Sequence, residues 1–173
     1  LLIVDEIQSG FGRTGKMFCF EHYGVEPDLV TCGKGISGSL PLSAVLGKSE
    51  IMDVELLHSS THGGHPLSCA AAIGNLTYFR DTDLISRAQG LESKIAGLIE
   101  KWRSKFPQRI SRVIGKGAVW GVFINQIGSD ELDAEYTDKL IMLALKKGVY
   151  SIRTGCGTIK IGPPLTITED ALE

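Results

Sequence analysis

Two short apolar runs near the start of the chain each lead into a charged residue, and this pattern constrains the fold more than any other feature. Residues 1–4 contain only Leu, Ile and Val and precede Asp5, while the run at 28–33 precedes Lys34. A short run that is apolar throughout is typical of a strand buried in a parallel sheet. Because the carboxyl ends of parallel strands meet at one edge of a sheet, we expect Asp5 and Lys34 at the same edge.

An amine and an acid at one sheet edge are the pair of groups that pyridoxal phosphate chemistry requires. The amine forms a Schiff base with the aldehyde of the cofactor, and the acid pairs with the protonated ring nitrogen. Charged residues also stand at strand ends simply because a sheet meets water there. The two residues alone therefore leave both interpretations open.

The composition is that of a globular chain with an ordinary core. Of the 173 residues 43% are hydrophobic, and a formal net charge of −2 argues against nucleic acid or an anionic membrane as the main partner. No apolar run reaches membrane-spanning length. The cysteines and histidines lack metal-ligand spacing, so we expect no metal site, and free thiols in a cytoplasmic protein. These residues are the four cysteines, Cys19, Cys32, Cys69 and Cys156, and three of the four histidines, His22, His58 and His62.

The order of predicted elements indicates an α/β fold with two domains. A domain at 1–80 contains strands at 1–4, 29–31 and 42–46 and an alanine-rich helix at 66–79. A domain at 81–173 has α+β character, with a boundary segment at residues 80–83. Its predicted helices lie at 84–106 and 134–147, and its predicted strands at 119–124, 149–152 and 158–161. The chain starts within a strand and stops within a helical first turn, so we expect part of a longer polypeptide.

Four ordered blocks resemble the class III aminotransferases, the ornithine and 4-aminobutyrate type. The blocks span residues 4–16, 27–35, 60–66 and 161–168. The resemblance implies a fold-type I transferase that depends on pyridoxal phosphate, with the second half of the large-domain sheet followed by a small α+β domain. It also implies that an N-terminal half is missing, with its phosphate loop and part of the substrate pocket. We therefore expect the fragment to be inactive alone.

The resemblance assigns roles to residues of the first domain. Lys34 becomes the Schiff-base lysine, which later shuttles a proton to and from the substrate carbon. Asp5 keeps the ring nitrogen protonated, and Gln8 hydrogen-bonds the phenolic oxygen of the ring. Thr61 precedes a Gly-Gly pair and a helix N-terminus, a combination that binds phosphate. In similar enzymes this threonine reaches the cofactor of the neighbouring subunit, which implies a homodimer.

Two cations near the end of the chain are candidates for the substrate carboxylate. Many relatives have arginine where this chain has Lys160, and lysine keeps the charge but loses the bidentate fork. Arg153 lies nearby in sequence and is a possible substitute. Either the contact is weaker here, or the amino donor has no α-carboxylate.

The predicted activity is ping-pong transfer of an amino group from an amine or amino acid to a 2-oxo acid. A racemase or a lyase of the same family is the nearest alternative, because family members share Asp5, Gln8 and Lys34 across these reactions. A non-catalytic interaction module that has kept the fold is the alternative from another class.

Overall fold

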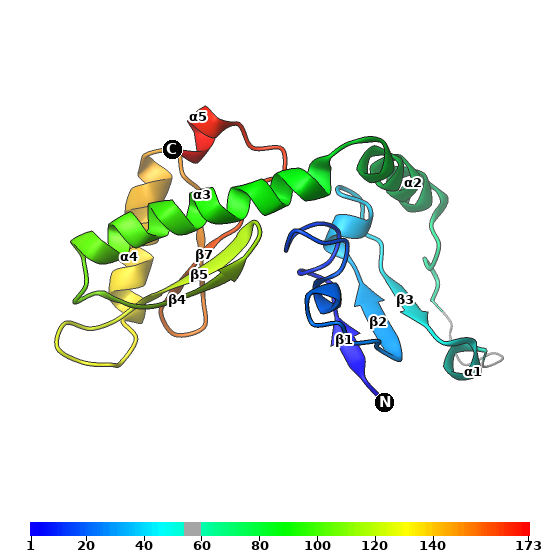
Figure 1. Cartoon of the computed structure of the whole chain (residues 1–173), viewed down its shortest axis with the longest axis horizontal. Helices are drawn as coiled ribbons and strands as arrows, with labels where there is room; N and C mark the ends of the chain where they lie inside the picture. Colours follow the sequence, from blue (N-terminus) through cyan, green and yellow to red (C-terminus); the bar gives the residue numbers. More distant parts are fainter. Residues whose placement is uncertain (54–59) are drawn as a thin grey trace. The chain divides into compact units, whose positions relative to one another are not determined.

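The computed structural model describes residues 1–53 and 60–173, and His58 lies outside this part. The chain forms two compact units, 1–88 and 89–173, which we describe separately (Figure 1). The division falls inside a helix rather than in the predicted boundary segment at 80–83. The assignment of domains to 1–80 and 81–173 stays a prediction.

The first unit is built on a three-stranded sheet in the order β1 (Ile3–Asp5), β2 (Leu29–Cys32), β3 (Ala44–Gly47). The first two strands are parallel, and β3 is antiparallel to β2. Val30 and Cys32 of the central strand are buried. Ile3 is 59% exposed, because β1 pairs with β2 on one side only in the part of the chain that the structure describes. The predicted burial of the run 1–4 is therefore not seen here.

Asp28 fixes the entry into β2. The Leu2 N–H donates to one of its carboxylate oxygens (2.7 Å) and Lys48 Nζ to the other (3.0 Å). Both bonds favour the charged carboxylate, and together they lower the pKa of Asp28, the backbone donor contributing most. This cluster joins the segments that precede β1, β2 and the single-turn helix α1 (Ser49–Met52).

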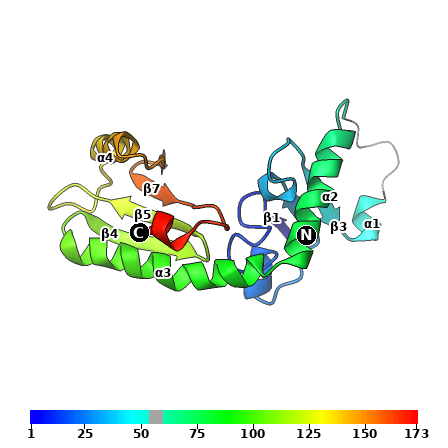
Figure 2. The ribbon, with the colours of Figure 1, turned by 90° about the horizontal axis from the view of Figure 1, so that it is seen from above.

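Helix α2 (Pro66–Asp81) closes the carboxyl end of this sheet. It starts with proline at its first position, where the missing N–H costs nothing. Ala72 and Phe79 are buried. Figure 1 shows α2 beyond the carboxyl ends of β1 and β2, and Figure 2 shows it in front of the same sheet. The helix is therefore placed to contact the loops that follow these strands.

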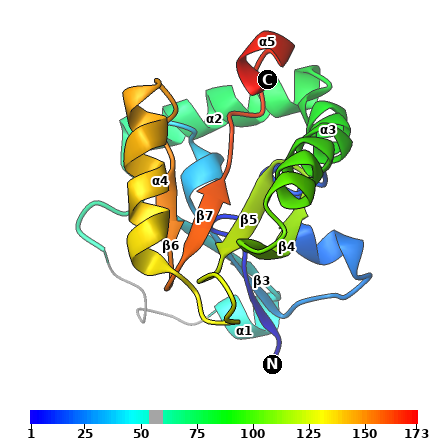
Figure 3. The same cartoon turned by 90° about the vertical axis from the view of Figure 1, so that its left-hand side faces the viewer.

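The second unit combines a four-stranded antiparallel sheet with helices. The strand order is β4 (Ile110–Lys116), β5 (Val119–Ile124), β7 (Thr158–Ile161), β6 (Ile152–Thr154). Helices α3 (Leu84–Lys105) and α4 (Ala134–Lys146) lie over one face of this sheet (Figure 3). The single turn α5 (Glu169–Leu172) follows β7. An apolar groove between the two helices and the sheet is lined in part by Val122, Ile124 and Ile159.

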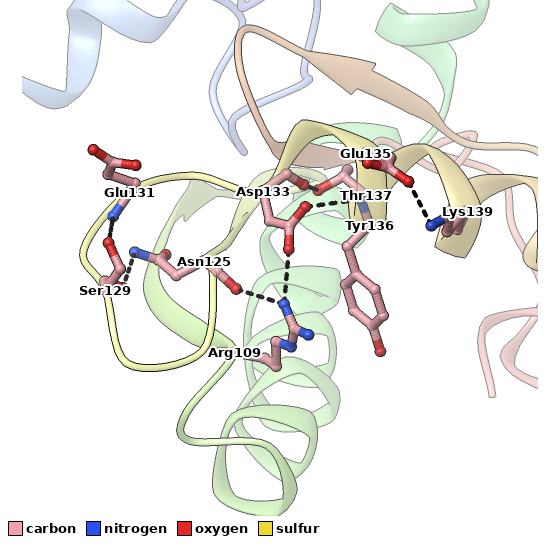
Figure 4. Close-up of polar contacts among 9 residues, drawn as sticks. All are labelled: Arg109, Asn125, Ser129, Glu131, Asp133, Glu135, Tyr136, Thr137 and Lys139. Carbon is pink, nitrogen blue, oxygen red and sulfur yellow. Dashed lines mark hydrogen bonds and ion pairs between the residues drawn. The ribbon is translucent and has the colours of Figure 1, made fainter.

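A polar cluster fixes the start of α4 against the beginning of β4 (Figure 4). The Asp133 carboxylate caps the helix by accepting from the Tyr136 N–H (2.9 Å). Arg109 donates to the same carboxylate (2.8 Å) and to the Asn125 carbonyl (3.1 Å). Its guanidinium also lies 4.1 Å from the centre of the Tyr136 ring. One half-buried arginine thus joins a helix cap, a strand end and an aromatic ring.

Most predicted elements are present, and two of the differences concern strands of the second unit. The strand β4 was not predicted, and its pattern explains why: it is an edge strand whose side chains are mostly exposed, so its sequence lacks clear alternation. The strand predicted at 149–152 is shifted to β6, Ile152–Thr154. Across the described ranges, no helix combines the length and apolar character that crossing a membrane requires.

Candidate active site

Asp5 and Lys34 lie at the same edge of the first sheet. The parallel register places Asp5 opposite Thr31, and the Glu6 N–H extends the pairing by donating to the Thr31 carbonyl (2.9 Å). Lys34 follows Thr31 after Cys32 and Gly33. The two strands therefore deliver a carboxylate and an amine to one edge.

The Asp5 carboxylate is oriented by one donor from the turn after β1 and one from β2. Its Oδ1 accepts from the Ile7 N–H (3.0 Å) and from the Thr31 hydroxyl (3.3 Å). The side chain is exposed, and among the described residues no donor reaches Oδ2. One oxygen is thus fixed to the sheet while the other is available to a cation.

Lys34 has a backbone conformation that few residues adopt. Its φ is +36°, in the left-handed region, and it begins the single 3-10 turn η2 (Lys34–Ile36). For a residue with a Cβ this conformation costs roughly 1–3 kcal/mol and persists only where the surroundings enforce it. The residue is exposed, and its amine makes no hydrogen bond or ion pair with another described residue. A strained backbone and an exposed side chain thus coincide at the sheet edge that also holds Asp5.

Packing around η2 leaves no room for a Cβ at Gly35 and makes one at Gly33 a tight contact. A Cβ on Gly35 would lie 2.8 Å from Phe11 Cβ, and one on Gly33 would lie 3.1 Å from a methyl group of Ile7. Phe11 belongs to the glycine-rich loop at 10–15, is buried and itself has a φ of +53°. This loop and η2 support each other directly.

Glu6 anchors that loop, and sequence reasoning gave it no role. It is fully buried, and its carboxylate accepts from the Ser9 hydroxyl (2.5 Å) and the Phe20 N–H (2.9 Å). Burial, with a smaller contribution from the Glu6 charge, raises the pKa of the nearby Cys32 thiol. In the sequence Glu6 is marked only by its position directly after Asp5 at the end of the strand. That position does not show whether its side chain points into the protein or into solvent.

Gln8 and Thr61 are the other two residues predicted to contact the cofactor. Gln8 is exposed and lies in the turn after β1, three positions beyond Asp5. Thr61 is exposed in the turn at 61–64, which leads into the N-terminus of α2. A hydroxyl next to free helix N–H groups is a favourable environment for an anion. Neither side chain makes a hydrogen bond to another described residue.

Lys160 and Arg153 lie in the second unit, on opposite faces of its sheet. Arg153 pairs with Ile159 and therefore shares the face that the helices cover, whereas Lys160, the next residue along β7, points to the other face. Arg153 Nε donates to Asp138 of α4 (2.7 Å) and another guanidinium nitrogen to the Gly155 carbonyl (2.6 Å). The Asp138 bond raises the pKa of Arg153. The Lys160 amine has no such partner among the described residues.

The exposed groups at the carboxyl edge of the first sheet have the chemistry that a cationic heterocycle with an aldehyde requires, and Thr61, in the turn before α2, has the chemistry of an anion site. Lys34 offers a free amine to a carbonyl, and the free oxygen of Asp5 can accept from a protonated ring nitrogen. Gln8 offers a neutral amide, and Thr61 with the start of α2 offers donors to an anion. In the described residues we find no group of histidines, cysteines and acids that can hold a metal ion.

Comparisons with known proteins agree on one family. The family described as Aminotransferase class-III matches residues 1–173. The chain is 39% identical to a 4-aminobutyrate aminotransferase of Mycobacterium leprae, covering 99% of this chain and 39% of the relative. It is 37% identical to a leucine/methionine racemase of Thermococcus litoralis, with coverage of 100% and 40%.

A solved structure shows the same fold. It is an ornithine aminotransferase of Toxoplasma gondii, described with partial occupancy of PLP at its active site. It superposes with a TM-score of 0.88 at 33% identity and covers 99% of this chain and 40% of that protein. The chain thus spans about two fifths of the length of the proteins it matches.

Proposed function

The chain belongs to the class III aminotransferases, and on that premise we propose that it carries the lysine-bearing part of a transaminase active site. The proposed reaction moves an amino group from an amine or amino acid to a 2-oxo acid by a ping-pong mechanism. It is an activity of the full-length protein, because the chain spans only 39% of the length of a related 4-aminobutyrate aminotransferase.

The proposed cofactor is pyridoxal 5'-phosphate. When bound, it supplies an aldehyde that combines with amines and a protonated ring that withdraws electrons from the substrate. The exposed Lys34, the exposed Gln8 and the Asp5 Oδ2, which no donor among the described residues reaches, support this assignment. The relative from T. gondii that is described with PLP supports it independently.

Four residues of the chain have tasks in this proposal. Lys34 holds the cofactor covalently and, once released, moves a proton at the substrate carbon. Asp5 holds a proton on the ring nitrogen, since an anion at that position favours the charged form. Gln8 donates to the phenolic oxygen. Thr61 binds the phosphate of the cofactor in a neighbouring subunit, which makes the enzyme a homodimer.

We assign the carboxylate of the substrate to Lys160 in preference to Arg153. The guanidinium of Arg153 is already held by Asp138 and the Gly155 carbonyl on the helix-covered face of its sheet. Lys160 points to the opposite face, and its amine has no partner among the described residues. We also propose a cytoplasmic location, because all four cysteines are free thiols.

The observation that carries the proposal is the left-handed, exposed Lys34 at the sheet edge that also holds Asp5. The test reduces the full-length protein with borohydride after loading with pyridoxal phosphate and maps the labelled peptide. We expect the label on Lys34 and its loss in Lys34→Ala. Lys48→Ala is the matched control, because Lys48 is bound to Asp28 away from the site. A label on another residue, or none, contradicts the proposal.

A racemase is the second candidate, favoured by the 37% identity to the leucine/methionine racemase. The two activities differ in their need for a 2-oxo acid. A transaminase consumes the amino donor only when the acceptor is present, whereas a racemase inverts an amino acid without it. Chiral chromatography of the products, with and without an added 2-oxo acid, therefore distinguishes them.

A further inference from the structure

Asn75, on helix α2, contacts the segment that carries Lys34. Its side-chain Nδ2 donates to the Gly35 carbonyl (2.6 Å) and to the Ile36 carbonyl (3.3 Å). Both carbonyls belong to the turn η2 that Lys34 begins. The contact joins residues far apart in sequence, and none of the four sequence blocks on which the resemblance to the family was based includes Asn75.

The turn η2 needs support from outside because its own bonds leave two carbonyls unused. Within the turn, the Ile36 N–H donates to the Gly33 carbonyl (3.0 Å) and the Gly38 N–H to the Lys34 carbonyl (3.2 Å). The carbonyls of Gly35 and Ile36 are instead bound by Asn75. An unfavourable φ of +36° at Lys34 is retained only if such contacts outweigh relaxation to an ordinary conformation.

The amide of asparagine suits this position better than other polar groups. Its –NH2 carries two donors and can serve two carbonyls, whereas an aspartate of the same shape only accepts. The other end of the amide is close to Gly38: a Cβ there would lie 3.2 Å from Asn75 Oδ1. The side chain is therefore packed across the whole turn, between its start and its end.

We propose that Asn75 is a positioning residue that holds Lys34 in the orientation from which its amine reacts. Asn75 acts through the carbonyls of Gly35 and Ile36, which fix the turn and thus the direction of the lysine side chain. This inference rests on the proposed role of Lys34. It predicts that the geometry of the lysine depends on a donor in helix α2.

The test compares Asn75→Asp and Asn75→Leu with wild type in the full-length protein. Both variants keep the size of the side chain and lose the donors, and Asn75→Asp adds a carboxylate that faces two carbonyl oxygens. The matched control is Gly74→Ala on the same helix, where an added Cβ meets no atom within 4 Å. Hydrogen exchange of the cofactor-free protein reports on the turn, and steady-state kinetics report on the lysine.

We expect faster exchange confined to the amides of Ile36 and Gly38, and a kcat lower by about tenfold with KM changed by less than about twofold. Asn75→Asp should be the more severe variant, and Gly74→Ala should match wild type. A purely structural role predicts faster exchange along α2 and an unchanged kcat per folded site, and that result overturns the inference.

Borohydride labelling of the same variants separates this inference from the proposed function. Labelling of Lys34 with wild-type exchange and kcat in both Asn75 variants refutes the positioning role alone. A label that never falls on Lys34 refutes both, because the inference has then lost the reaction it positions.

Discussion

The packing of Gly35 against Phe11 gives a direct test of how tightly the Lys34 turn is held. Gly35→Ala adds one methyl group whose carbon would lie 2.8 Å from Phe11 Cβ and 3.3 Å from two carbons of the Phe11 ring. Ordinary contact begins at 3.4 Å. Phe11 is 6% exposed and already has a left-handed backbone, so it has little freedom to move away.

The magnitude follows from this overlap. Overpacking by a single methylene in a closely packed region costs roughly 1–3 kcal/mol. If the strain is relieved by displacement of the turn, its native population relative to the displaced form falls by about 5- to 150-fold. We therefore expect kcat to fall by about tenfold or more, since a small misplacement of a reacting group is enough to cause such a loss.

The assay measures kcat and the amount of borohydride-labelled Lys34 in the full-length Gly35→Ala protein. Gly74→Ala is the control for the same chemical change, because its Cβ would lie in open space. We expect a normal result for the control and reduced kcat and labelling for Gly35→Ala. Wild-type kcat and labelling in Gly35→Ala would refute the argument that these contacts hold the lysine.

Three further predictions concern other groups of the chain. Glu6→Ala should destabilise the protein by about 2–5 kcal/mol in denaturation experiments, because it removes a fully buried side chain and leaves the half-buried Phe20 N–H without its acceptor. Ser9→Ala removes a single donor and should have a smaller effect; equal effects would contradict the anchoring role. At about pH 8 an alkylating reagent should modify the exposed Cys156 well before Cys32, because the raised pKa and the burial of Cys32 leave little accessible thiolate. Mass spectrometry of the native protein gives the order of modification, and early modification of Cys32 would be inconsistent with its burial. Because the pKa of Asp28 is lowered in the folded state, its stabilising effect is present above about pH 4 and is lost as the pH falls through the pKa of the folded state. Asp28→Asn should therefore reduce the acid-induced fall in the free energy of unfolding, and an unchanged pH profile would argue against the two hydrogen bonds that Asp28 accepts.

Helices and strands could be predicted from the sequence where the spacing of apolar residues is compatible with only one kind of element. The apolar positions of helix α3 recur at steps of three and four, and Leu84, Ala88, Leu91, Ile95 and Ile99 are all buried. Strand β4 was missed because an edge strand exposes most of its side chains and needs no alternation.

The same distinction applies to the candidate site. Asp5 and Lys34 could be predicted to lie together because strand direction alone brings them to one edge. The anchoring role of Glu6 depends on a bond to Phe20, and the contact of Asn75 on a partner some 40 positions away. Such tertiary contacts leave no periodic trace in the sequence, so only coordinates reveal them.

The alternation along β7 has a consequence for how this protein can change. Successive side chains of a strand point to opposite faces of the sheet, so Lys160 and its neighbour Ile159 lie on opposite faces of β7. An insertion of one residue between Gly157 and Lys160 that shifts the pairing would exchange the two side chains, turning a cation into the apolar groove and an isoleucine outward. Length variation in this hairpin should therefore be accommodated in its glycine turn or in steps of two.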